Sequence, residues 1–258
     1  MTALSVNLNK IALLRNSRAG DSPSVIAAAE TVINSGAQGI TVHPRPDQRH
    51  IRPADVGALA QLLEAYPNIE FNIEGNPAAG PRDNGYPGFD ALIESARPHQ
   101  ATLVPDSDSQ LTSDHGWDLS GDNSTLTETI ARYQDWGARV SLFMDPEPQQ
   151  IAAAKVCGAD RIELYTGPFA ATVARFGTEH EETRQAFSTY RAAAEFAADQ
   201  GLGVNAGHDL DTENLPLFNQ IQGLLEVSIG HALIKDALEV GLSAAVAAYL
   251  AALQQDIP

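Results

Sequence analysis

The sequence predicts an α/β protein of the TIM (β/α)8-barrel class, folded as a single domain over residues 1–258 with extra helices. A junction that recurs along the chain supports this prediction. A helix-like segment ends in Gly and a short β-branched run follows at once, at Gly36, Gly137, Gly158 and Gly201. Gly just past a helix end adopts the left-handed conformation that closes the last turn. Repetition of the unit predicts alternating helices and strands, and hence a parallel sheet.

Eight short runs are typical of buried parallel strands. They are Leu4–Leu8, Gly39–Val42, Glu70–Ile73, Ala101–Val104, Arg139–Met144, Arg161–Leu164, Gly203–Asn205 and Leu225–Ile229. Helical patterns separate most of them, at Ser24–Asn34, Ala54–Glu64, Thr125–Trp136, Gln149–Val156, Glu181–Asp199 and Ala232–Leu253. Thr125 and Glu128 have the spacing of a capping box. An open doubly wound sheet is the alternative, but it usually has a Gly-rich fingerprint after its first strand, where this chain has Asn9-Lys10-Ile11-Ala12.

The composition predicts a globular protein and excludes several function classes. Hydrophobic residues make up 43% of the 258 residues and charged residues 19%, which suits a sizeable core. The formal net charge of −17 disfavours binding to nucleic acid or to an anionic membrane surface. Cys157 is the only cysteine, so no intrachain disulfide and no Cys-based zinc site is expected. Without an 18-residue apolar run or a signal-peptide pattern, we expect a cytoplasmic protein.

Polar side chains follow nearly every predicted strand, where a barrel places its active site. They are Asn7, Asn9 and Lys10 after the first strand, His43, Arg45 and His50 after the second, Glu74 on the third, Glu163 on the sixth, and His208 and His231 after the last two. Because loops are often polar, any one of these residues could be polar by chance. Chance explains poorly why polar residues follow nearly every predicted strand. Histidine and carboxylate side chains predict acid/base chemistry. Glu70 and Glu74 share a face of the third strand, and we prefer Glu74 because it lies at the carboxyl end.

Two groups of residues are candidate anion sites. Gly207 and the pair Gly230-His231 lie where the last two strands lead into helices, the usual phosphate site of this fold. Arg18, Arg45 and His50 could hold a second anion. Zinc or iron would suit His and Glu ligands, but no His-x-His or His-Glu-x-x-His spacing is present, so we expect no metal.

The chain resembles the pyridoxine 5′-phosphate synthase family through motifs that span nearly its whole length, in order. The matching stretches are Val6–Arg18, Gly39–Arg45, Arg49–Ile51, Asn72–Gly75, Leu103–Asp106, Val140–Phe143, Glu163–Gly167, Val204–His208 and Ile229–Ala232. The resemblance implies a TIM barrel assembled as a homo-octamer. It implies condensation of 3-amino-2-oxopropyl phosphate with 1-deoxy-D-xylulose 5-phosphate to pyridoxine 5′-phosphate, phosphate and water, without a cofactor.

The resemblance also implies a role for individual residues. His43 and Glu74 are the expected proton acceptors, and His208 is the expected proton donor. The expected aminoketone phosphate ligands are Asn7, Gly207, Gly230 and His231, and those of the sugar phosphate are Asn9, Lys10, Arg18, Arg45, His50 and Thr112. Glu163, from its matching stretch, is a further substrate-binding candidate.

The sequence departs from the commonest family pattern in two places. Asn9-Lys10 stands where that pattern has Asp-His, which replaces an acid and an imidazole by an amide and a fixed cation. The segment Asn76–Gly88 is longer than in compact members. Two alternatives stay open. One is another phosphosugar-binding TIM-barrel enzyme, an isomerase or an aldolase with Lys10 as its only Lys near a predicted strand end. The other is a catalytically inert phosphometabolite sensor.

Overall fold

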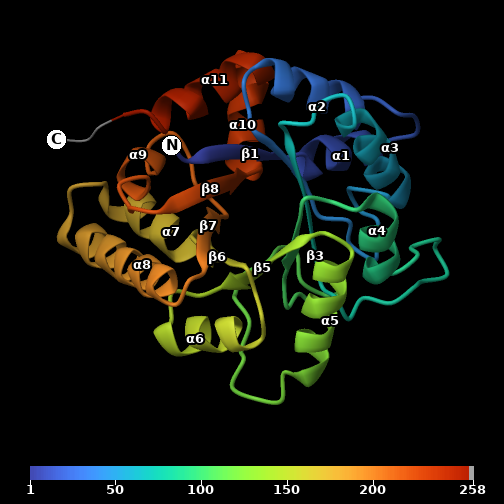
Figure 1. The fold of residues 1–258 in the computed structure, drawn as a ribbon. Coiled ribbons are helices and arrows are strands. Elements are labelled where there is room, and N and C mark those ends of the chain that lie inside the picture. Colours follow the sequence, from blue (N-terminus) through green and yellow to red (C-terminus); the bar gives the residue numbers. More distant parts are fainter. Residues whose placement is uncertain (256–258) are drawn as a thin grey trace.

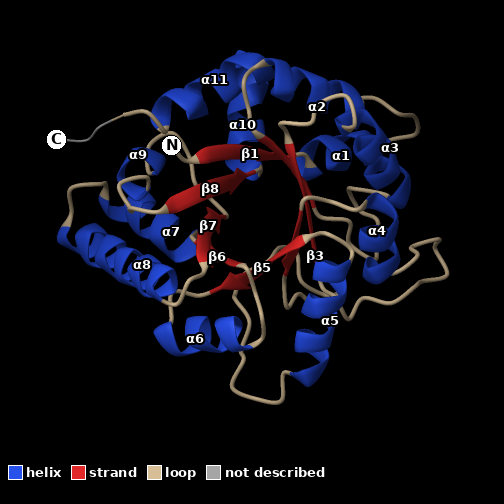
Figure 2. Cartoon of the chain, in the orientation of Figure 1, coloured by secondary structure: helices blue, strands red, loops and turns tan. Residues whose placement is uncertain are grey.

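The computed structural model, which describes residues 1–255, is a closed barrel of eight parallel strands in sequence order. The strands are β1 (Ala3–Asn7), β2 (Gly39–Val42), β3 (Glu70–Gly75), β4 (Gln100–Leu103), β5 (Arg139–Met144), β6 (Arg161–Tyr165), β7 (Gly203–Gly207) and β8 (Leu224–Ile229). Pairing of β1 with β8, Leu4 opposite Val227, closes the ring. Figures 1 and 2 show this ring of strands with the helices outside it. The predicted TIM-barrel class is therefore confirmed.

The helices connect the strands and cover the outside of the barrel. They are α1 (Asn9–Asn16), α2 (Val25–Asn34), α3 (Pro53–Leu63), α4 (Phe89–Ala96), α5 (Ser124–Asp135), α6 (Pro148–Val156), α7 (Gly167–Phe176), α8 (Glu181–Asp199), α9 (Leu215–Phe218), α10 (His231–Val240) and α11 (Leu242–Ala252). Within residues 1–255, no helix combines the length and the apolar character needed to cross a membrane.

The predicted Gly junctions have the expected backbone conformation. Gly36, Gly137, Gly158 and Gly201 have φ values of 101°, 91°, 92° and 73°, and each follows a helix. An L side chain rarely adopts this region, so Gly ends the helix and turns the chain toward the next strand.

Two local predictions are wrong. The segment predicted as one helix, Ala232–Leu253, is divided into α10 and α11 at Gly241, whose φ of 87° interrupts the helix. The predicted capping box at Thr125 is absent, because α5 starts one residue earlier and has Asn123 as its N-cap residue. In addition, α1 begins directly after β1, in a segment for which the sequence predicted no helix.

The interior of the barrel is polar. Side chains alternate along each strand, so that Phe71 and Ile73 of β3 pack outward under the helices while Asn72 points inward. Buried inward polar side chains come from most strands, including Ser5, Thr41, Asn72, Gln100, Thr102, Ser141, Glu163, Asn205 and Glu226. Hydrogen bonds join them, such as Thr102 Oγ1 donating to Asn72 Oδ1 at 3.0 Å. Barrels more often fill this space with Val, Ile and Leu. In this protein polar and charged side chains fill it instead, and they set the electrostatics of the site above it.

Candidate active site

A cavity of about 400 Å³ lies at the carboxyl ends of the strands. The predicted site residues that line it are Asn7, Asn9, Lys10, His43, Arg45, His50, Glu74, Thr112, Glu163, His208, Gly230 and His231. Of the predicted set, Arg18 and Gly207 are not among the lining residues of the described chain. Arg18 is exposed on the segment after α1, and Gly207 packs behind Glu163. The structure thus brings together most of the residues that the strand-end argument selected.

Glu74 is a largely enclosed carboxyl group in this cavity, with 12% of its side chain exposed. Asn7 Nδ2 donates to its Oε2 at 3.2 Å, and Ser228 Oγ donates to its Oε1 at 3.4 Å. Burial first, and then the charge of Asp106, raise the pKa of Glu74 to about 8, although Ser228 and Arg45 act in the opposite direction. A carboxyl group with this pKa exchanges a proton readily near neutral pH. Glu70 begins the same strand at the opposite end of the barrel, where it pairs with Arg139.

His43 faces Glu74 from the end of β2. Its Nδ1 lies 3.9 Å from Glu74 Oε2, and its backbone N–H donates to Asn9 Oδ1 at 2.9 Å. Asn7 Oδ1 in turn accepts from the backbone N–H of Asn9 at 3.0 Å. Burial, followed by the charges of Arg45 and His50, holds the pKa of His43 well below its usual value. The lowered pKa keeps the imidazole neutral, with one unprotonated ring nitrogen, and makes it a weaker base than a free histidine. Asn9 fixes its backbone.

His50 is a second neutral imidazole. Its Nδ1 accepts a hydrogen bond from the backbone N–H of Ile51 at 2.9 Å, so its remaining hydrogen is on Nε2. Burial, together with the charges of Arg45 and Arg49, lowers its pKa to about 3. A neutral imidazole with Nε2–H is a hydrogen-bond donor to an anion or a hydroxyl group.

Glu163 projects from β6 into the same cavity. Its side chain is buried, and within residues 1–255 its Oε2 has no hydrogen-bond partner. Burial, then Glu74 and Glu226, raise its pKa well above the usual value, which favours the protonated carboxyl group. A Cβ on Gly207 would lie 2.2 Å from Glu163 Oε1. Gly207 is therefore required for space beside this carboxyl group.

His208 follows β7 in an unusual backbone conformation. Its φ is 85° and that of Asp209 is 60°, a region that residues other than Gly seldom adopt. The imidazole is held at both nitrogens, because Nε2 lies 2.8 Å from Thr112 Oγ1 and Nδ1 lies 2.8 Å from Asp209 Oδ2. The hydrogen bond from His208 is the main cause of a lowered pKa at Asp209. Backbone strain of this kind concentrates at functional sites.

Cationic and N–H donor groups surround the rest of the cavity. Lys10 lies in the first turn of α1, and Gly230 is the N-cap residue of α10, whose first residue is His231. Free backbone N–H groups at a helix N-terminus attract anions. Arg45 and Arg49 also line it. The cavity therefore combines cationic and N–H donor groups suited to phosphate with acid/base groups.

The sequence argument missed three residues that complete the site. Asp209 orients His208, Ser228 contacts Glu74, and Asp106 pairs with Arg45. Ser228 lies within the last predicted strand, Asp106 two residues after the fourth and Asp209 four residues after the seventh, so their positions near strand ends were visible in the sequence. The contacts themselves depend on the folding of distant segments. Among the described residues, no three His, Cys, Asp or Glu side chains form a group that could hold a metal ion, and the expected absence of a metal stays a prediction.

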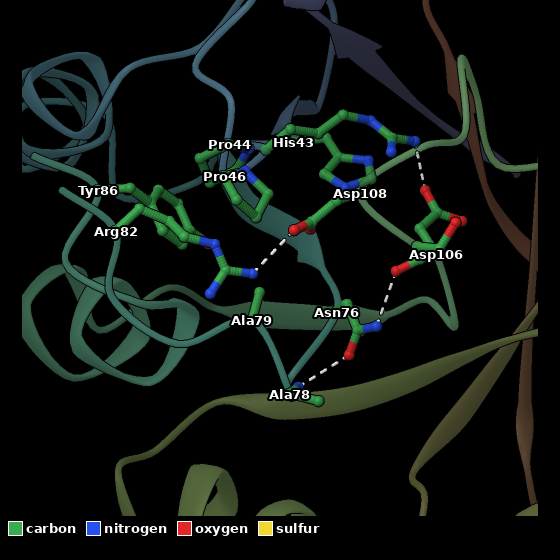
Figure 3. Close-up of a pocket in the computed structure, with 12 residues that line it drawn as sticks. His43, Pro44, Pro46, Asn76, Ala78, Ala79, Arg82, Tyr86, Asp106 and Asp108 are labelled. Atoms are coloured by element: carbon green, nitrogen blue, oxygen red, sulfur yellow. Dashed lines mark hydrogen bonds and ion pairs between the residues drawn. The ribbon is translucent and has the colours of Figure 1, made fainter. Parts of the chain in front are cut away.

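A smaller cavity of about 140 Å³ lies beside the first and shares His43 and Arg45 with it (Figure 3). The long segment after β3 supplies one wall through Asn76 and Tyr86, and Asp106 and Asp108 line the other side. Arg82 pairs with Asp108 across it at 2.9 Å. We refer to it below as the side cavity and to the larger one as the reaction cavity.

The fold and the site define a TIM-barrel enzyme in which buried carboxyl and imidazole groups, bordered by cations, surround one cavity. The family model described as "Pyridoxal phosphate biosynthesis protein PdxJ" matches residues 4–255. The chain belongs to this family, as its sequence motifs indicated.

Individual relatives agree over nearly their full length. A pyridoxine 5′-phosphate synthase of Albidiferax ferrireducens is 53% identical over 256 residues, covering 98% of each chain. One of Xanthomonas oryzae pv. oryzae is 55% identical over 250 residues, covering 96% of this chain and 95% of the relative. Among solved structures, 3-hexulose-6-phosphate synthase from Salmonella typhimurium has a TM-score of 0.60 at 14% identity, over 98% of this chain and 99% of that one. At this identity the likeness concerns the fold.

Proposed function

We propose that the protein is an enzyme that condenses 3-amino-2-oxopropyl phosphate with 1-deoxy-D-xylulose 5-phosphate to give pyridoxine 5′-phosphate, phosphate and water. Family membership supports the reaction, and the observation that carries its mechanism is the grouping of Glu74, His43 and His208 around one cavity. The isomerase, aldolase and inert-sensor alternatives have no comparable support.

The chemistry requires several proton transfers within one cavity. The amine nitrogen attacks the ketone carbon and loses a proton to a base, for which we propose Glu74 with neutral His43 beside it. The former ketone oxygen takes up protons and leaves as water, for which His208 is the proposed donor. The C–O bond to the sugar phosphate breaks and a new C–C bond closes the ring, so that one phosphate and, in total, two water molecules leave for each pyridoxine 5′-phosphate formed. Acid/base groups of this kind each contribute roughly 10²–10⁴ in rate.

Two anion regions serve the two phosphorylated substrates in this proposal. Asn7 and the backbone N–H groups near Gly207, Gly230 and His231 hold the aminoketone phosphate. The proposed sugar-phosphate ligands are Asn9, Lys10, Arg45, His50 and Thr112, which line the reaction cavity, together with Arg18, which does not line it. Protonated Glu163 donates a hydrogen bond to a substrate oxygen between them. Binding both substrates side by side makes the condensation effectively unimolecular.

An assay of the purified protein with both substrates tests the proposal. We expect pyridoxine 5′-phosphate, detected by its fluorescence, to form together with inorganic phosphate in equal amounts. Omission of either substrate should abolish both signals. Binding of both substrates without product would support the sensor alternative instead.

We further propose a homo-octamer that works in the cytoplasm. Leu14 of α1 and Leu238 of α10 are 51% and 76% exposed, and a subunit contact would cover them. The lone Cys157 is buried as a free thiol, as suits a reducing compartment. Sedimentation velocity of the purified protein tests the octamer and cell fractionation tests the location. A stable monomer would contradict the first proposal.

A further inference from the structure

Asp106 is a buried carboxylate that contacts the site through Arg45. It follows β4 and forms an ion pair with Arg45, and the two side chains are 3% and 6% exposed. Arg45 lines both cavities, whereas Asp106 lines only the side cavity, where Figure 3 shows it. Asp106 therefore contacts the Arg45 guanidinium group without lining the reaction cavity itself.

The same residue joins segments that follow three different strands. Its carboxylate accepts from Arg45 after β2 and, at 2.7 Å, from Ser113 Oγ in the segment after β4. Its backbone carbonyl accepts from Asn76 Nδ2, after β3, at 2.8 Å. Asp106 Oδ1 is buried and has no hydrogen-bond partner within residues 1–255. A buried ion pair with one oxygen left unpaired lowers stability relative to a fully satisfied pair, so packing alone does not account for it.

We propose that Asp106 is a positioning residue for the sugar-phosphate half of the reaction, acting through Arg45. The proposal rests on the function proposed above. A buried guanidinium group needs a counter-charge and a fixed direction to bind a planar or tetrahedral anion with directed hydrogen bonds. Asp106 supplies both from outside the reaction cavity, so that the remaining N–H groups of Arg45 stay oriented before substrate arrives.

Asp106 also balances the charges that surround Glu74. His43 faces Glu74 from the end of β2, Glu163 from β6 and Asp106 from beyond β4, while Arg45 is the nearby cation that affects its pKa. The charge of Asp106 raises the pKa of Glu74, and Arg45 lowers it. Removal of the Asp106 charge eliminates the increase in the pKa of Glu74. It also leaves Arg45, which lowers that pKa, without its counter-charge. Both changes move the pKa of Glu74 downward.

The test is a comparison of Asp106→Asn with Asp108→Asn. Both residues lie in the same segment, each pairs with an Arg, and each substitution removes one negative charge, but the Asp108 side chain is 64% exposed and pairs with Arg82. For Asp106→Asn we expect a KM for 1-deoxy-D-xylulose 5-phosphate raised about tenfold, as for loss of a charge-assisted hydrogen bond. The acid limb of its pH profile should move to lower pH. Asp108→Asn should match the wild type, and Asp106→Glu should recover part of the KM.

A double-mutant cycle separates positioning from a general loss of structure. If Asp106 acts through Arg45, then Asp106→Asn should change KM little when added to Arg45→Met. Additive effects, or a folded Asp106→Asn enzyme with the wild-type KM and pH profile, would overturn the proposal. Wild-type protein assayed in parallel distinguishes this failure from that of the proposed function, since only the latter leaves the wild type without turnover.

Discussion

Thr112 Oγ1 lies 2.8 Å from Nε2 of His208, although 96 residues separate them in the sequence. The contact brings the polar segment after β4 over the ring nitrogen of a proposed proton donor. The other ring nitrogen, Nδ1, is hydrogen-bonded to Asp209, so Thr112 and Asp209 together define the orientation of the imidazole. The two contacts fix the ring, so a substrate that bound at Nε2 in place of Thr112 would meet an imidazole that is already oriented.

The substitution His208→Asn tests this role. We expect turnover to fall by at least about 10²-fold with the fold intact, as for loss of a general acid. His115 provides a matched control. Its Nδ1 is hydrogen-bonded to the adjacent Asp114 at 2.6 Å, as that of His208 is to Asp209, but His115 does not line the described reaction cavity. His115→Asn should leave turnover unchanged. Single-turnover kinetics measures the rate, and circular dichroism checks that the fold is intact. Near-normal turnover in His208→Asn would remove the residue from the mechanism.

Glu74→Gln and Glu70→Gln distinguish the two carboxylates of β3. Both point into the barrel, but Glu74 lines the reaction cavity and Glu70 pairs with Arg139 at the other end. We expect Glu74→Gln to lower kcat by about 10²-fold or more, as for loss of a general base, and Glu70→Gln to lower it far less. Steady-state kinetics of both variants measures the difference. A larger catalytic loss in Glu70→Gln would reverse the assignment.

Glu74 is expected to limit stability in a pH-dependent way. Its pKa is about 8 in the folded protein against 4.5 ordinarily, so the folded state keeps a proton that the unfolded chain releases. Stability is therefore lost as the pH rises from about 4.5 to about 8. Glu74→Gln removes this linkage and should raise the free energy of unfolding by about 3 kcal/mol at pH 7, and by less than about 1 kcal/mol at pH 5. Urea denaturation at both values checks it, and an equal gain at both would contradict it.

Lys10 is expected to stabilise charge at the sugar-phosphate site. It lines the reaction cavity from the first turn of α1, and its charge acts on His50 and Asp209. A fixed cation stabilises an anionic substrate or a developing oxyanion. Lys10→Met should therefore raise KM for the sugar phosphate or lower kcat, and Lys10→Arg should retain part of either. Unchanged kinetics in Lys10→Met would indicate that Lys10 is only a solvated side chain. Loss of one limb of the pH–rate profile in this variant would indicate that Lys10 carries a proton in the reaction.

Gly207→Ala tests the space beside Glu163. The added methyl group would lie 2.2 Å from Glu163 Oε1, so the carboxyl group or the strand must move. Overpacking of this kind destabilises by about 1–3 kcal/mol, and we expect a lower melting temperature and reduced turnover. Gly57→Ala is the control, because a methyl group added there would have no atom within 4 Å and α3 should gain up to about 1 kcal/mol. Equal melting temperatures in the two variants would show that the site adapts freely.

The barrel and the positions of most site residues can be predicted from local sequence patterns. Gly36, Gly137, Gly158 and Gly201 marked helix ends because their backbone conformation is a local property that few other residues adopt. Parallel strands place all their carboxyl ends on one face, so His43, Glu74 and His208 could be assigned to one site without knowledge of any contact.

The contacts of these residues, in contrast, depend on how distant segments fold together. The start of α5 and the helix α1 depend on packing and capping that periodicity does not encode. The boundary at Gly241 is a local Gly signal that the helical periodicity of the segment concealed. Asn9 stays a predicted ligand, and the structure adds that its side chain accepts from the backbone N–H of His43. Asp106 reaches Arg45 across 61 residues. The exposed position of Arg18 and the place of Gly207 behind Glu163 likewise follow from the closed barrel. Sequence patterns report local conformation and facing direction, whereas burial, charge balance and pKa arise from neighbours that only barrel closure brings together.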